Sequence, residues 1–173
     1  MKRSRSRKVV IPVVLIAVAV VGANRLVATK SDVPAAVPEE KVWVVETAAV
    51  AFTDEQPDLV LFGCTSASFY EGPDWNRGFQ ADLTELAGVP AITTTGAMVE
   101  ALRRDGVRTV DVITPYVETT NERLRRYLEA EGVGVKSFGT FDMLDMFDHA
   151  RIQPSDVYQK VRQVASDDAD AVF

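Results

Sequence analysis

The sequence predicts an α/β fold, a parallel sheet flanked by helices. From residue 41 onward, short apolar runs alternate with longer segments in which apolar residues recur at helical spacing. Gly or Pro closes most of these segments. Strands that alternate with helices of this length imply parallel pairing with right-handed crossovers. The 173 residues are too few for two full cores, so we expect one such domain with an N-terminal appendage.

Composition narrows the classes of protein that the chain could be. Apolar residues make up 47% and charged residues 25%, which excludes a disordered, collagen-like or coiled-coil chain. The net charge of -6 provides no broad basic surface, so we expect no nucleic acid as a partner. One cysteine and one histidine exclude an internal disulfide and a zinc site built on several Cys and His ligands, and we expect no metal.

Residues 1–40 differ from the rest of the chain. Basic residues up to Lys8 precede an uncharged run, Val9 to Ala23, and Pro34 and Pro38 then indicate a linker. The run has the form of a secretory signal and is shorter than the roughly 20 residues of a spanning helix. It equally fits a buried first strand of a parallel sheet. Both interpretations stay open, and contact with a membrane is expected only if the segment is a signal or an anchor.

Within residues 41–173 the elements follow in order. Apolar spacing predicts helices around residues 42–52, 79–86, 98–102, 124–128 and 154–165, and apolar runs predict strands at 59–62, 91–94, 109–114 and 133–138. Thr119 and Glu122 have the spacing of a capping box for the fourth helix. Pro154 fits the first turn of the last helix.

The last residues of the sequence look like the start of a strand that does not continue. A turn at 167–170 precedes Ala171–Phe173, which read as the first residues of another strand. We therefore expect the chain to be a fragment of a longer α/β protein.

Ligands of open α/β sheets bind beyond the carboxyl ends of the strands. After the strand at 59–62 come Gly63, Cys64, Thr65 and Ser66, where we expect Gly63 to allow an unusual turn and the following groups to form a nest for a carboxylate. Cys64 is either a nucleophile or a small buried residue.

Two further strand ends carry polar groups. Thr93, Thr94 and Thr95, followed by Gly96, could cap a helix or hydrogen-bond an anion. Tyr116 places a phenol after the strand at 109–114, where it could donate to a ligand or only pack its ring. We expect His149 to be a solvated surface group, and the acidic run at 142–148 lacks the spacing of a metal loop.

The stretch Phe62–Phe69, with the sequence FGCTSASF, resembles the maleate cis-trans isomerase and arylmalonate decarboxylase group of the aspartate/glutamate racemase superfamily. The likeness extends from about residue 46 to the end, through the motifs at 88–90, 93–95, 101–102, 106–107, 114–116 and 121–124. It implies an aspartate/glutamate racemase-like half plus part of the second half. Members of the group use no cofactor and place one cysteine in each half.

The resemblance implies a role for each matching residue. Cys64 is similar to the first-half cysteine, which in the isomerases attacks the double bond of maleate. Thr65, Ser66 and Tyr116 look like the groups that bind the substrate carboxylate. Thr94, Thr95 and Asn24 are weaker candidates, the last because the family's first strand is followed by a loop containing asparagine.

The implied function is a cofactor-independent cis-trans isomerase of a small dicarboxylate, such as maleate. The decarboxylases of the group lack the first cysteine, so Cys64 favours an isomerase, or a racemase or epimerase, over a decarboxylase. The second cysteine would follow the strand at Ala171, and Asp142–Leu144 stands where the isomerases have an asparagine. A non-catalytic, carboxylate-binding remnant is therefore a further alternative.

The resemblance also implies a cellular location. The family works in the cytoplasm, so a cytoplasmic protein is expected unless residues 1–23 act as an export signal. The oligomeric state stays open, although a half-domain with an exposed sheet edge is prone to pair with another chain and a homo-oligomer would fit this.

Overall fold

A computed structural model describes residues 9–10, 49–50 and 57–173 of the chain. The chain divides into two compact units. Residues 16–97 form the first, which we call the Cys64 unit. Residues 98–173 with residues 1–15 form the second, which we call the Tyr116 unit.

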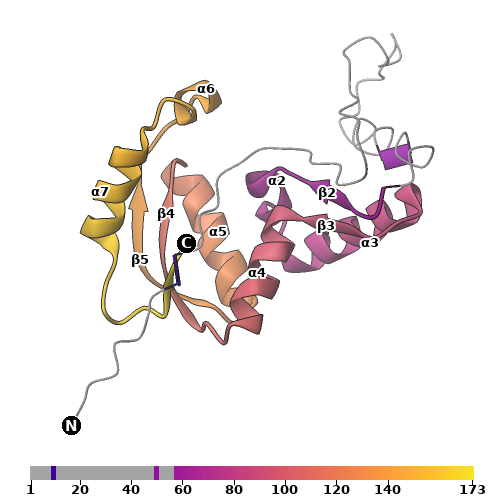
Figure 1. Ribbon diagram of the computed structural model, residues 1–173, viewed down its shortest axis with the longest axis horizontal. Coiled ribbons are helices and arrows are strands. Elements are labelled where there is room, and N and C mark those ends of the chain that lie inside the picture. Colours follow the sequence, from indigo (N-terminus) through magenta and orange to yellow (C-terminus); the bar gives the residue numbers. More distant parts are fainter. Residues whose placement is uncertain (1–8, 11–48, 51–56) are drawn as a thin grey trace. The chain divides into compact units, whose positions relative to one another are not determined.

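Helices and strands alternate along the chain (Figure 1). The elements are β1 (Val9–Val10), β2 (Val60–Phe62), α2 (Thr65–Phe69), α3 (Pro73–Ala87), β3 (Ala91–Thr93), α4 (Thr94–Arg104), β4 (Thr109–Thr114), α5 (Glu118–Ala130), β5 (Gly134–Thr140), α6 (Met146–His149), α7 (Pro154–Val164) and β6 (Ala171–Val172).

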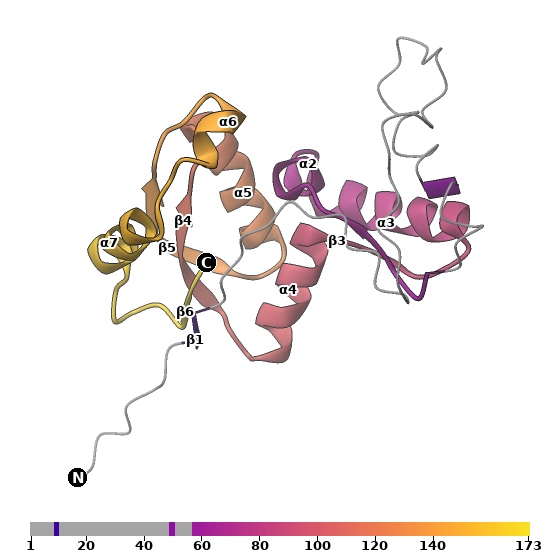
Figure 2. The same cartoon turned by 45° about the horizontal axis from the view of Figure 1, so that its top comes forward.

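The Cys64 unit is built on two parallel strands, β2 and β3, paired from Val60 with Ala91 to Phe62 with Thr93. Helix α3 runs alongside both strands (Figure 2). Its apolar side buries Leu83 and Ala87 against the strands. Because α3 also carries charged residues on its other side, the helix is amphipathic and its burial stabilises the two short strands.

The Tyr116 unit contains a four-stranded parallel sheet in the order β1-β6-β4-β5. Figure 1 shows α7 on one side of β4 and β5 and α5 on the other. Successive residues of β5 face these two helices, because Phe138 lies under the Arg125 guanidinium of α5 whereas Gly139 lies against Val164 of α7. The central strand β4 is covered on both faces, and Val112 is fully buried.

The parallel α/β class that the sequence predicts is confirmed, and several details differ. The strands form two sheets rather than one. The capping box of Thr119 and Glu122 is wrong: α5 already begins at Glu118, because the N–H groups of Thr120 and Asn121 both bond to the carbonyl of Val117. Thr119 therefore lies inside the first turn. A capping box does occur on α7, between Gln153 and Asp156.

The N-terminal segment is described only at Val9 and Val10, which form β1 and pair with Ala171 and Val172 of β6. Asn24 and the predicted helical positions 42, 45 and 52 lie outside the described residues. The domain boundary at residue 40 and the choice between a signal and a first strand stay predictions. In the ranges that the structure describes, no helix is long and apolar enough to cross a membrane.

Gly139 allows α7 to pack closely on β5, because a Cβ atom there would lie 2.5 Å from Cγ2 of Val164. We expect Gly139→Ala to lower the free energy of unfolding by about 1–3 kcal/mol through overpacking. Urea denaturation followed by circular dichroism measures this. Gly134→Ala is the control in the same strand, since its Cβ would meet neighbours at 3.7 Å. Equal losses in the two variants would contradict the packing argument.

Asp170 stabilises the start of β4, since Oδ2 accepts hydrogen bonds from the N–H groups of Arg108 and Thr109 and from the Thr109 hydroxyl. These bonds lower the pKa of Asp170 below 3.8, its ordinary value. The stabilisation is therefore present above that value and is lost as the pH falls through the lowered pKa. We expect the wild-type protein to be more stable than Asp170→Asn at neutral pH. The difference in urea midpoint should shrink as the pH falls below 3.8, and a constant difference would contradict the assignment.

Candidate active site

Cys64 lies at the point where β2 gives way to α2. It is the N-cap of α2, with an extended backbone (φ −106°, ψ 101°) and an exposed side chain. The first hydrogen bond of α2 runs from the N–H of Ser68 to the carbonyl of Cys64, 3.1 Å. Gly63 is not among the glycines with positive φ, so the expected unusual turn at Gly63 is wrong. The chain changes direction after β2 because α2 begins at Thr65.

A pair of buried hydroxyl groups holds α2 in place. Ser68 and Thr95 are fully buried, and their hydroxyl oxygens lie 2.5 Å apart. Both hydroxyl groups also reach the carbonyl oxygen of Thr65, at 2.8 Å from Ser68 and 3.1 Å from Thr95. The N–H of Thr95 donates to the Ser68 hydroxyl, 3.2 Å. The first turn of α2 is thus bound to the first turn of α4.

The threonines at 93–95 hold the backbone around the junction of β3 and α4 through hydrogen bonds. The Thr93 hydroxyl accepts a bond from the N–H of Gly96 and so caps α4, a role that the sequence suggested for the threonine run at 93–95. Thr94 donates to the carbonyl of Phe62, 3.1 Å. Gly96 lets α4 approach α3, because a Cβ there would lie 3.0 Å from Oε1 of Gln80. The hydroxyls of Thr94 and Thr95 thus bond to carbonyls of the chain itself.

Three of the predicted site residues are brought together by this arrangement. The sulfur of Cys64 lies 3.9 Å from the hydroxyl oxygen of Ser66, and Thr65 and Ser66 are both half-buried. The N–H groups of the first turn of a helix have no acceptor within that helix. An exposed thiol is therefore next to hydroxyl and N–H donors, which is an arrangement suited to a nucleophile and the oxyanion that its attack creates.

Tyr116 is held at the end of β4 in the Tyr116 unit. The buried Thr114 hydroxyl donates to Oδ1 of Asn121, 2.5 Å, and accepts from the N–H of Tyr116, 3.2 Å. The side-chain amide of Asn121 donates to the carbonyl of Tyr116, 2.9 Å. The Thr140 hydroxyl also donates to this carbonyl. The backbone of Tyr116 is thereby fixed by side chains from β4, α5 and β5.

Sequence reasoning did not predict the supporting role of these residues, and it treated Thr95 only as a weaker ligand candidate or a helix cap. Ser68, Thr95, Thr114 and Asn121 are polar but almost fully buried, with exposed fractions of at most 3%. The available signal was a hydroxyl at the end of an apolar strand followed by a second polar residue in the next helix. Such a pattern does not indicate burial, because burial depends on which helix packs over the strand end.

His149 is half-buried, which is less exposed than the solvated surface position that the sequence predicted. Its ring lies edge-on to Tyr116, with centroids 6.0 Å apart and planes at 64°. Its Nε2 atom is 3.4 Å from the carbonyl oxygen of Met143. The chain that follows β5 runs back to the end of β4, and this places the His149 imidazole next to Tyr116.

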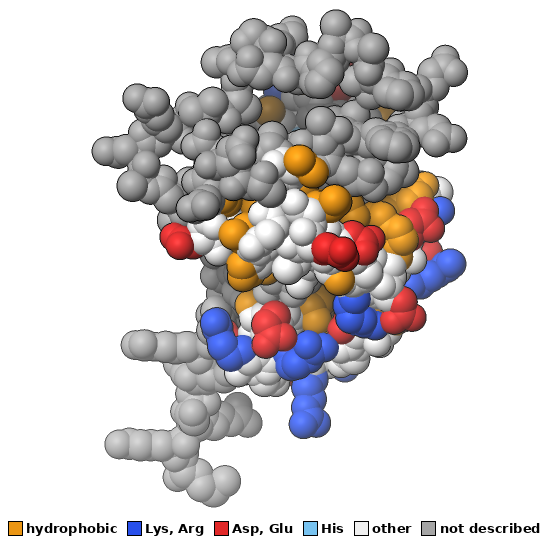
Figure 3. Space-filling view, turned by 90° about the vertical axis from the view of Figure 1, so that its right-hand side faces the viewer, with side chains coloured by type: hydrophobic (Ala, Val, Ile, Leu, Met, Phe, Trp, Pro, Cys, Tyr) orange, Lys and Arg blue, Asp and Glu red, His pale blue; other side chains and the backbone are white. Residues whose placement is uncertain are grey.

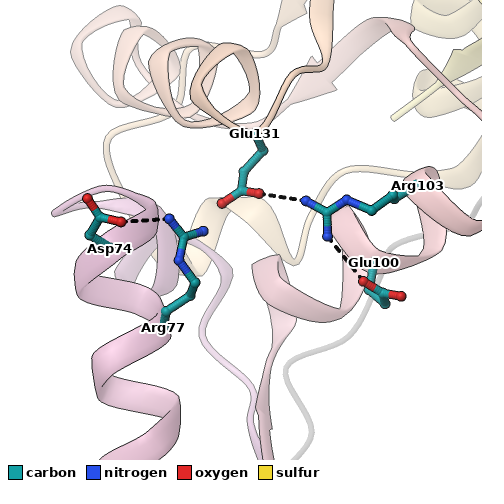
Figure 4. Close-up of polar contacts among 5 residues, drawn as sticks. All are labelled: Asp74, Arg77, Glu100, Arg103 and Glu131. Carbon is teal, nitrogen blue, oxygen red and sulfur yellow. Dashed lines mark hydrogen bonds and ion pairs between the residues drawn. The ribbon is translucent and has the colours of Figure 1, made fainter.

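Charged side chains away from these groups form ion pairs, in most of which both side chains are at least partly exposed. The face drawn in Figure 3 carries acidic and basic side chains close together. Figure 4 shows Asp74 bonded to Arg77, and Arg103 reaching both Glu100 and Glu131. In the part of the chain that the structure describes, no three His, Cys, Asp or Glu side chains are grouped to hold a metal ion.

Comparison with known proteins identifies related chains. The family model described as arylmalonate decarboxylase matches residues 35–173. A maleate isomerase of Alcaligenes faecalis is 27% identical over 130 residues, which are 72% of this chain and 51% of the relative. An arylmalonate decarboxylase of Bordetella bronchiseptica is 37% identical over 78 residues, 43% of this chain and 32% of the relative.

A solved structure shows the same fold. It is a mutant of the maleate cis-trans isomerase of Nocardia farcinica with a covalently bound succinylcysteine intermediate. The TM-score is 0.70 at 24% identity, and the match covers 74% of this chain and 54% of that one. The chain thus spans about half the length of the maleate isomerases that it matches.

The Ser68 and Thr95 pair gives a test of how the Cys64 loop is held. Ser68→Ala removes one hydroxyl and leaves the buried N–H of Thr95 without that acceptor, so we expect a loss of about 1–3 kcal/mol in the free energy of unfolding. Urea denaturation measures the loss. Ser155→Ala, at an exposed position of α7, is the control and should change stability by less than about 0.5 kcal/mol. A Ser68→Ala protein as stable as the control would refute this role of the pair.

Proposed function

The chain belongs to the arylmalonate decarboxylase family, and we propose that it contributes a cysteine nucleophile to the cofactor-independent isomerisation of a small dicarboxylate, as maleate to fumarate. Its relatives include maleate isomerases, and these support the choice of reaction. The substrate and the reaction are proposals, because the chain spans about half the length of the maleate isomerases that it matches.

The observation that carries the proposal is the position of Cys64. Its thiol is exposed at the start of α2, 3.9 Å from the Ser66 hydroxyl, on a loop that the buried Ser68 and Thr95 pair holds in place. A cysteine that only filled space would be expected inside the core. In the Nocardia farcinica isomerase, a succinylcysteine intermediate has been trapped, which supports a thioether adduct as the chemistry of such a residue.

The reaction follows from the chemistry of a conjugated carboxylate. The Cys64 thiolate adds to one olefinic carbon, a C–S bond forms, and the electron pair of the double bond moves into the carboxylate on the adjacent carbon. The bond that was double is then single and rotates. When the electron pair returns, the C–S bond breaks, the thiolate leaves and fumarate remains. No proton or electron is gained or lost overall, so the cycle needs no cofactor.

Hydrogen-bond donors stabilise the intermediate because negative charge accumulates on the carboxylate oxygens. In the Cys64 unit, we assign this role to the hydroxyl and N–H groups of Thr65 and Ser66. We assign the Tyr116 phenol to a substrate carboxylate on the basis of the resemblance of Thr114–Tyr116 to the family motif. We assign a supporting role to Thr94 and Thr95, whose hydroxyls bond to the carbonyls of Phe62 and Thr65.

Decarboxylation of an arylmalonate is the second candidate function. It is favoured by the higher identity, 37%, to the Bordetella bronchiseptica arylmalonate decarboxylase over 78 residues. This reaction breaks a C–C bond, releases carbon dioxide and leaves an enediolate that takes up a proton. It makes no use of addition by Cys64, so the two candidates respond differently to loss of the thiol.

Replacement of the thiol gives the direct test. We expect wild-type protein incubated with maleate to form fumarate, which proton NMR distinguishes by its single olefinic resonance. Cys64→Ser should lower the rate by a factor on the order of 10³ or more, as removal of other catalytic nucleophiles does. Ser66→Ala should cost about 10²-fold, the effect of one oxyanion donor. Ser155→Ala should turn over maleate at the wild-type rate.

The following results would contradict the isomerase proposal or the binding of maleate at Cys64. Fumarate formed at the same rate by Cys64→Ser would refute the adduct mechanism. Carbon dioxide released from phenylmalonate, with maleate unchanged, would replace the isomerase proposal by the decarboxylase. Because Cys64 is the sole cysteine, intact mass after iodoacetamide treatment reports its reactivity alone, and maleate should slow the alkylation. Alkylation that is unaffected by maleate would count against binding at Cys64.

A further inference from the structure

Two consecutive threonines in the first turn of α4 bond to the backbone on both sides of Cys64. The Thr94 hydroxyl donates to the carbonyl of Phe62, the last residue of β2, at 3.1 Å. The Thr95 hydroxyl donates to the carbonyl of Thr65, the first residue of α2, also at 3.1 Å. Cys64 therefore lies between two carbonyl groups that are held by the same turn of one helix.

The two sides of Cys64 are held in different ways. Phe62 belongs to a strand and is also held by the pairing of β2 with β3. Thr65 lies beyond the strand, and its carbonyl accepts from two hydroxyl groups, those of Thr95 and Ser68. Both of these side chains are fully buried, so a hydroxyl that is lost there is not replaced by water at no cost. The Thr65 side should therefore be the more sensitive to a lost hydroxyl.

The bond to the Thr65 carbonyl also determines the direction of a neighbouring donor. A peptide group is planar and trans, so its C=O and its N–H point in opposite directions. A hydroxyl that holds the carbonyl of Thr65 therefore also fixes the N–H of Ser66. This N–H is one of the groups that we assign to the substrate carboxylate.

We infer that Thr94 and Thr95 are positioning residues for Cys64: they fix the backbone on both sides of the cysteine, and with it the place of the thiol beside Ser66. The Cys64 side chain adds little to its own position. In the described first turn of α2 it makes no capping bond, and its sulfur lies 3.9 Å from the Ser66 hydroxyl oxygen. Threonine suits the task because its branched Cβ restricts χ1, and so the direction of the hydroxyl.

The positioning is tested on the full chain without a substrate. Because Cys64 is the sole cysteine, cysteine labelled with carbon-13 at Cβ gives one NMR signal. We expect Thr95→Val, which keeps the shape of the side chain and removes the hydroxyl, to shift or split this signal. Thr95→Ser retains the hydroxyl and should keep the signal near its wild-type position.

Thr84→Val is the matched control in the same unit. The Thr84 hydroxyl donates to the carbonyl of Gln80, 2.9 Å, and accepts from the N–H of Ala91, 3.0 Å. Ala91 begins β3, whereas Thr94 and Thr95 follow its end, so this control removes a hydroxyl at the opposite end of the strand. The Cys64 signal should stay in place in Thr84→Val.

An unchanged Cys64 signal in folded Thr95→Val would overturn the inference. Thr94→Val, at a half-buried position, provides a second test if Thr95→Val does not fold. A signal that moves in Thr94→Val and returns in Thr94→Ser would support the positioning role. A signal that stays in place in Thr94→Val would overturn it.

The consequence for catalysis rests on the proposed function and has a separate readout. We expect Thr95→Val to lower kcat for maleate about tenfold and to change KM by less than about twofold, because a misplaced thiol impairs the addition step rather than binding. Thr95→Ser should restore kcat to within about twofold of the wild-type value. Thr84→Val should have the wild-type kcat. An unchanged kcat in Thr95→Val would overturn the role of Thr95 in the reaction.

The two proposals can fail independently. No fumarate from the wild-type protein would refute the isomerase proposal, and the Cys64 carbon signal would still decide whether Thr95 positions the thiol. Fumarate from the wild-type protein, together with an unchanged carbon signal in Thr95→Val, would overturn the positioning inference and leave the isomerase proposal in place.

Discussion

A buried hydroxyl group beyond the end of a parallel strand is the feature on which the loops of this protein depend. In the Cys64 unit the hydroxyls of Ser68 and Thr95, 2.5 Å apart, meet at the carbonyl of Thr65. In the Tyr116 unit the hydroxyl of Thr114 bonds to Asn121, which in turn bonds to the carbonyl of Tyr116. Each pair ties a strand end or its loop to a helix that follows, and each bonds to the backbone carbonyl of a predicted site residue, Thr65 or Tyr116.

These contacts are effective because they are buried. A hydrogen bond contributes only about 1 kcal/mol net, since the unfolded chain bonds equally well to water. A buried polar group that loses its partner costs more than the bond was worth. Loop conformations that break these buried hydrogen bonds are therefore higher in free energy than the conformation that keeps them. Exposed pairs such as Asp74 with Arg77 impose no such penalty, because water replaces either partner.

The same reasoning separates residues that would do chemistry from residues that support them. Cys64 and Ser66 present exposed or half-buried groups at the start of α2, where a substrate could reach them. Thr94 and Thr95, whose hydroxyls bond to carbonyls within the unit, hold the first turn of α4 against β2 and α2. His149 contacts the ring of Tyr116 from a segment more than thirty residues later in the chain.

The sequence alone determined the α/β class, most of the elements and the family, because apolar spacing, Gly and Pro are local signals and the FGCTSASF motif is specific. It also indicated Cys64, Thr65, Ser66 and Tyr116, since reactive and polar groups after apolar strands stand out in a linear reading. Only the tertiary structure decided that α5 begins at Glu118, that Ser68 and Thr95 are buried, and that His149 meets Tyr116. Burial and ring contacts arise between segments distant in the chain, and their energies depend on packing that no local pattern records.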